Sequence, residues 1–153
     1  MELLQSIEQL GAVQLLKSSF IAYPVVNALH IAAIGALLTG VVLMDLAVLG
    51  WIISLPREKF IALLRRVVFV AFFVAALTGL ALFSVQATNY VRNPAFLLKL
   101  GLIGLASLNF IAFSALYRTS RAEEISPSLR VSAVVSIALW TGVLLCGRFI
   151  GFL

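Results

Sequence analysis

The chain has 153 residues, of which 63% are hydrophobic and 11% are charged, and its mean hydropathy is +1.15. Soluble domains are roughly 45–50% apolar and ~25% charged, so this composition indicates a membrane protein. The formal net charge of +5 comes from basic residues that flank apolar segments. This placement indicates orientation in a membrane and excludes nucleic-acid binding as its explanation. The single cysteine, Cys146, cannot form a disulfide within the chain.

The N-terminal segment, residues 2–16, is expected to lie at the membrane surface. Its apolar side chains recur at helical spacing with polar residues between them, which predicts a short amphipathic interfacial helix. Glu2 and Glu8 stand where a secretory signal needs basic residues, so a signal peptide is not expected.

Four apolar segments follow, and each is long enough to span a bilayer, for which about 20 apolar residues suffice. They cover residues 22–53, 67–86, 95–117 and 131–152. The sequence therefore predicts an all-α protein, an antiparallel four-helix transmembrane bundle that forms one domain over residues 1–153.

Basic residues are concentrated in two of the connections, at residues 54–66 and 118–130. The positive-inside rule places these two connections in the cytoplasm. Both termini are then expected on the outer, periplasmic side.

Three nitrogen-bearing side chains fall in the expected outer half of the spans, His30, Lys99 and Arg148, and no acid falls there. Such a group predicts an outward-facing basic pocket for an anion: a carboxylate, a phosphate, a haem propionate, a lipid headgroup or an acidic partner. The residues expected to orient that ligand are Asn27, Gln86 and Asn109. Alternatively, the two cations extend to the headgroups and His30 hydrogen-bonds a neighbouring helix.

His30 is the only histidine. One imidazole cannot by itself complete a zinc site or a two-histidine centre. It could be a single axial ligand to the iron of haem b, or one of two such ligands across a homodimer.

Asp45 is expected in the cytoplasmic half, close in depth to Arg65 and Arg66 on the next span and to Arg118 or Arg130, and Arg66 is its expected partner. A structural ion pair between them is the favoured interpretation, because an unpaired carboxylate there is costly. A proton relay is the alternative, but a second acid within the spans is lacking.

Three short segments carry a resemblance: YPVVNALH (23–30), DLAVLGW (45–51) and GRFIGF (147–152). They resemble an uncharacterised bacterial family of small four-span inner-membrane proteins. The positions that match that family are His30, Asp45, Lys99, Asn109 and Arg148. The resemblance implies a multi-pass protein of the bacterial inner membrane and no particular activity.

A more distant resemblance is to cytochrome b561-type and copper-resistance CopD-type four-helix membrane proteins, and it implies haem or copper chemistry. This chain lacks their several histidines and has only two methionines, so a copper site is not expected.

The leading hypothesis is a ligand-binding or redox-accessory membrane subunit that holds haem or another anionic ligand. The alternative is a structural or assembly subunit that recruits a partner membrane or periplasmic protein without a cofactor. A small oligomeric transporter or channel is a third hypothesis. No catalytic motif is present, so an enzyme is not expected.

Overall fold

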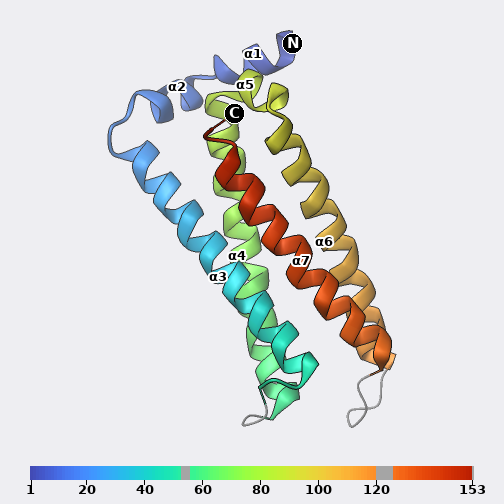
Figure 1. Cartoon of the computed structure of the whole chain (residues 1–153). Coiled ribbons are helices and arrows are strands. Elements are labelled where there is room, and N and C mark those ends of the chain that lie inside the picture. The colour runs from blue at the N-terminus through green and yellow to red at the C-terminus, as the bar shows by residue number, and fades with distance from the viewer. Residues whose placement is uncertain (53–55, 120–125, 153) are drawn as a thin grey trace.

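The computed structural model describes residues 1–52, 56–119 and 126–152, and over these residues the regular structure is entirely helical. Figure 1 shows four long helices side by side, with the short helices gathered at one end together with both termini. We call this the terminal end, and the opposite one the loop end. The helices are α1 (Glu2–Glu8), α2 (Gly11–Ser18), α3 (Ala22–Leu49), α4 (Arg57–Val85), α5 (Ala87–Arg92), α6 (Pro94–Thr119) and α7 (Pro127–Phe149). The prediction of an all-α bundle is confirmed.

The four long helices have the length and composition of membrane spans. Each contains an apolar stretch with a mean hydropathy of at least 1.9. The shortest, α7, has 23 residues, and at ~1.5 Å per residue such a helix exceeds the roughly 30 Å hydrocarbon core of a bilayer. The chain is therefore a multi-pass membrane protein.

The bounds of all four spans differ from the sequence expectation, and two of the differences are at the end of α3 and the start of α4. Helix α3 ends at Leu49 because Gly50 adopts a left-handed conformation, with φ of 85°. The N–H of Trp51 then donates back to the Leu46 carbonyl at 3.0 Å, which closes the helix end. The expected end at residue 53 lies outside the described residues. Helix α4 begins at Arg57, so the basic segment before the apolar run is helical.

The N-terminal segment forms two helices where the sequence predicted one. The chain breaks at Leu10, whose ψ of 134° is extended, and α1 and α2 lie across the terminal end of the bundle (Figure 1). The Glu8 carboxylate accepts hydrogen bonds from the backbone N–H of Thr88, at 2.8 Å, and from its hydroxyl. Thr88 lies in the first turn of α5, within a segment expected to be a loop. The carboxylate thus caps α5 from a distant part of the chain.

The bundle consists of two antiparallel helix pairs, α3 with α4 and α6 with α7, which meet where α3 packs on α7. Within the described residues, the backbones of α4 and α6 do not approach each other. The α3–α4 pair is close because Gly40 leaves room for Val68: a Cβ at position 40 would lie only 2.6 Å from Cγ2 of Val68. Small residues allow such an approach between spans.

Asn93 links the start of α6 to the end of α7 at the terminal end of the bundle. Its side-chain oxygen accepts from the backbone N–H groups of Ala95, at 3.0 Å, and Phe96, at 3.2 Å. Its amide nitrogen donates to the carbonyl of Ile150 at 3.3 Å. The cap of α6 therefore also holds the end of the chain.

Candidate functional site

Polar side chains meet inside the bundle at two depths. One group, near the terminal end, contains His30 and Lys99. The other, toward the loop end, contains Asp45 and Asn109. The sequence predicted a single basic pocket, but the structure places the predicted residues His30 and Lys99 at one site and Asn109 at the other.

The His30 ring is held by α4. Its Nδ1 lies 2.9 Å from the hydroxyl oxygen of Thr78. That hydroxyl has one hydrogen, which it donates to the carbonyl of Val74 at 2.6 Å. Thr78 therefore accepts a hydrogen bond from Nδ1–H of the ring. In the neutral ring this leaves the lone pair on Nε2, which can accept a hydrogen bond or bind a metal.

The His30 ring packs directly against Gly79 of α4, which has no side chain. A Cβ at position 79 would lie 3.0 Å from Cε1 of His30 and 3.8 Å from Nε2. A side chain there would force the imidazole to shift by a few tenths of an ångström. Thr78 and Gly79 were not among the expected site residues, and the sequence signal for them is only a polar–small pair within an uncharged span.

Lys99 lies in the second turn of α6 and is half-buried. A Cβ at Gly147 of α7 would lie 3.5 Å from its Nζ atom, so the ammonium group packs beside this glycine. Lys99 is also near enough to His30 for its charge to act on the imidazole. Two of the three nitrogen-bearing groups expected in the outer half are thus within electrostatic reach of each other.

No carboxylate in the long helices is available to neutralise Lys99. Of the acids in the chain, only Asp45 and Glu58 belong to these helices, and both lie toward the loop end. Lys99 is therefore a cation in the membrane without an acidic partner from the spans.

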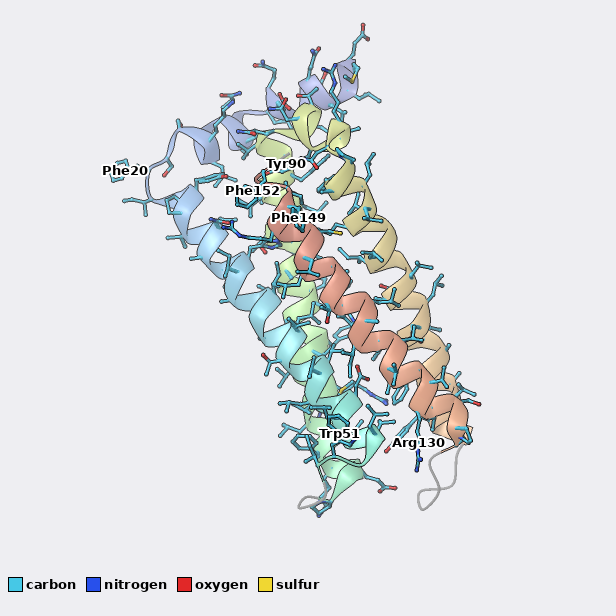
Figure 2. The ribbon with its side chains drawn as sticks, viewed as in Figure 1. Phe20, Trp51, Tyr90, Arg130, Phe149 and Phe152 are labelled. Carbon is cyan, nitrogen blue, oxygen red and sulfur yellow. The ribbon has the colours of Figure 1, made fainter. Side chains whose placement is uncertain are left out.

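The other residues expected in this pocket lie elsewhere. Asn27, Gln86 and Arg148 are exposed. The Arg148 guanidinium stacks 4.9 Å from the ring centre of Phe152, at the end of α7 where Phe149 and Phe152 are labelled in Figure 2. This cation–π contact at the terminal end fits the alternative that Arg148 extends to the headgroups.

Asn109 is at the second site, in a closed pair with Ser132 of α7. Its amide donates to the Ser132 carbonyl at 3.0 Å, and the Ser132 hydroxyl donates to the Asn109 side-chain oxygen at 2.9 Å. These reciprocal bonds join α6 to α7 within the membrane. Asn109 does not orient a ligand at His30 in this structure.

Asp45 is only 4% exposed, and its hydrogen-bond partner is Ser136 of α7. Its Oδ2 atom has no hydrogen-bond partner among the described residues. Arg66 is exposed on α4, so the structure does not bring it to Asp45 in the expected ion pair. The neighbouring Arg65 lies with its guanidinium 5.9 Å from the ring centre of Tyr117.

A cavity of about 300 Å³ lies beside Asp45, between all four long helices. It has an apolar, largely aromatic wall and a few polar groups. Its lining residues are Leu37, Val41, Met44, Asp45, Val68, Phe69, Phe72, Ser107, Asn109, Phe110, Ile111, Phe113, Ser132, Ser136 and Trp140. The sequence did not predict this cavity, since it depends on how the helices are rotated.

The side chains do not assemble a metal centre of their own. Among the described residues, no group of three histidine, cysteine or acidic side chains could hold an ion. Any metal at His30 would need its other ligands from outside the described residues.

The architecture and its polar sites define a multi-pass, four-span membrane protein. Comparison with models of known families, with curated proteins and with solved structures finds no match. The resemblance to an uncharacterised four-span family therefore stays a prediction.

Proposed function

We propose that the chain is a ligand-binding subunit of the bacterial inner membrane that takes an anionic group at Lys99 and His30. The observation that carries this proposal is Lys99 itself, half-buried on α6 and without an acid in the same half of the spans. A cation in that position is costly unless it is paired. The ammonium group of Lys99 packs beside Gly147 of α7.

The two side chains are complementary toward one class of ligand. Lys99 supplies a positive charge, and Nε2 of His30 supplies a hydrogen-bond acceptor. A phosphate monoester that keeps one proton offers both an anionic oxygen and an O–H donor. With the terminal end on the outer side, as the positive-inside rule favours, the phosphate would come from the outer leaflet or from the periplasm.

Haem b fits these residues less well. The lone pair on Nε2 is free for iron, and Lys99 suits a propionate. However, the His30 ring packs against α4 at Gly79, and the 300 Å³ cavity lies at Asp45 rather than at the imidazole. A visible spectrum after expression with ample haem tests this directly: a Soret band that His30→Ala abolishes would replace the phosphate proposal.

Thermal unfolding in detergent tests the phosphate proposal. The probes are dihexanoyl phosphatidic acid, inorganic phosphate and, as the control, dihexanoyl phosphatidylcholine. We expect phosphatidic acid to raise the melting temperature of the protein and of Arg148→Gln, and to leave Lys99→Gln unchanged. A rise with inorganic phosphate as well would identify the headgroup alone as sufficient. Equal stabilisation of Lys99→Gln and Arg148→Gln, or equal effects of the two lipids, would contradict the proposal.

A second candidate function is an assembly subunit, as a homodimer or with a partner membrane protein. It is favoured by the low burial of two spans: only 17% of the central window of α4 and 11% of that of α6 is buried within the chain. Lipid covers such surfaces as readily as protein does. Chemical crosslinking in native membranes, followed by purification, tests this function, and recovery of the uncrosslinked monomer alone would reject it.

A further inference from the structure

The cavity beside Asp45 has the properties of a small-molecule site. Its volume of about 300 Å³ is at the lower end of the range for ligand pockets, and such pockets are mostly apolar with a few placed polar groups. All four long helices contribute to its wall. It lies toward the loop end, so it is separate from the group formed by His30 and Lys99.

Asp45 presents an unsatisfied acceptor to this cavity. The side chain is 4% exposed and lines the cavity, and its Oδ2 atom has no hydrogen-bond partner among the described residues. A buried carboxylate oxygen without a partner is costly. The missing partner is a donor, and a positively charged donor would offset most of that cost.

The neighbouring polar groups do not meet this need. Asn109 and Ser132 satisfy each other through two hydrogen bonds of 3.0 and 2.9 Å. The Ser136 hydroxyl is the partner that Asp45 already has. The polar groups that line the cavity therefore leave the donor site at Oδ2 open to a molecule in the cavity.

Aromatic rings make up much of the remaining wall. They come from three helices: Phe69, Phe72, Phe110, Phe113 and Trp140. The Trp140 indole meets Phe72 edge to face, with ring centres 6.5 Å apart. A carboxylate surrounded by aromatic rings is the arrangement that recognises substituted ammonium ions, since ring faces attract cations.

The cavity opens toward the acyl chains of the bilayer. Two of its lining residues, Phe69 of α4 and Ile111 of α6, are 68% and 64% exposed. They belong to the two helices whose backbones do not approach each other in the described part of the chain. A ligand can therefore reach Asp45 sideways from the membrane, between α4 and α6.

We propose that this cavity is a binding site for a lipophilic ammonium ion, which enters from the bilayer between α4 and α6 and places its cationic nitrogen against Oδ2 of Asp45. The carboxylate provides the charge, and the aromatic rings provide the apolar wall and cation–π attraction. A neutral molecule of the same shape fills the same space but leaves Oδ2 without a partner.

The probe is N,N-dimethylbenzylammonium, whose charged nitrogen carries one N–H donor, and its matched control is isobutylbenzene, in which a C–H group replaces the charged N–H group. The Trp51→Phe protein in zwitterionic nanodiscs reports on the cavity directly. Trp51 is 78% exposed at the loop end (Figure 2), and its replacement leaves Trp140 as the only tryptophan, because the chain has two. We expect a saturable change in Trp140 emission with the cation, and much weaker binding of the neutral control.

Asp45→Asn keeps the shape of the side chain and removes its charge. We expect this variant to bind the cation roughly 30-fold more weakly or worse, as is typical when one partner of a buried charge pair is removed. Its affinity for isobutylbenzene should not change. Equal affinity of the unsubstituted protein for both probes, or equal cation affinity with Asp45 and with Asn, would overturn the proposal.

Arg65 provides a further control, because its Nε atom is also buried without a hydrogen-bond partner. If Arg65 paired with Asp45 in the membrane, Arg65→Gln would free the carboxylate and strengthen cation binding, and the proposed open site would be wrong. We expect unchanged binding. Lys99→Gln should also bind the cation normally, so a failure of this proposal is separable from a failure of the anion site.

Discussion

The replacement Gly40→Ala should weaken the α3–α4 pair. The added Cβ would lie 2.6 Å from Cγ2 of Val68, closer than real Cβ contacts occur, and Val68 is only 7% exposed. A valine in a helix has one strongly preferred rotamer, so the methyl group cannot turn away without strain. Overpacking of this kind costs ~1–3 kcal/mol, whereas alanine in place of glycine returns at most about 1 kcal/mol of helix propensity. We expect a net loss of roughly 1–2 kcal/mol.

The assay is unfolding in mixed dodecyl maltoside and sodium dodecyl sulfate micelles, followed by circular dichroism. Gly35→Ala is the matched control on the same helix, because a Cβ there has no neighbour within 4 Å, and it should be neutral or slightly stabilising. Adding Val68→Ala to Gly40→Ala should remove the clash and appear as a favourable coupling between the two sites. Equal stability of Gly40→Ala and Gly35→Ala, or additive effects in the double variant, would refute the close approach as the cause.

Three further predictions concern polar contacts. The hydrogen bonds from Thr88 hold the pKa of Glu8 below its usual 4.5, so docking of α1 on α5 should be complete above that pH and lost as the pH falls below it. The Thr88 amide proton resonance should titrate with a midpoint below 4.5 and stay flat in Glu8→Gln; a midpoint at or above 4.5 would contradict this. Asn109→Leu leaves the hydroxyl of buried Ser132 without its acceptor and should cost about 1–3 kcal/mol in the micelle assay, whereas an unchanged midpoint would show that the pair adds no stability. Asn93→Ala removes the cap of α6 and should speed hydrogen exchange in its first turn by about fivefold, equivalent to ~1 kcal/mol; unchanged exchange would argue against the cap.

The number and type of the long elements follow from the sequence because they depend on local properties. Hydropathy alone marks four spans, and the ring of His30 and the ammonium group of Lys99 fall in the same half because each lies a few residues past a helix start. Depth along a helix is fixed by a rise of about 1.5 Å per residue. The same rise places Asn109, which follows Pro94 by 15 residues, at a different depth from the His30 group.

Rotation about the helix axis is what the sequence does not determine. Asp45 was matched with Arg66 by charge and depth, but α3 turns that carboxylate toward Ser136 of α7 while Arg66 is exposed. Asn27 and Arg148 similarly have the right depth and are exposed. The sequence of an apolar span gives little indication of which side faces the bundle and which faces the lipid, because lipid and protein interior are equally apolar. The cavity at Asp45 depends entirely on this rotation.

The contact between Glu8 and Thr88 sets an order for biosynthesis. The two residues are 80 positions apart, and α3 and α4 lie between them. The N-terminal helices leave the ribosome first, yet the group that anchors α1 is made only after the first two spans. Since α3 and α4 run in opposite directions, Thr88 reaches the terminal end only when both have been inserted. Helices α1 and α2 are thus synthesised before α3 and α4 but reach their final position after them, and their docking indicates that this helix pair has crossed the membrane.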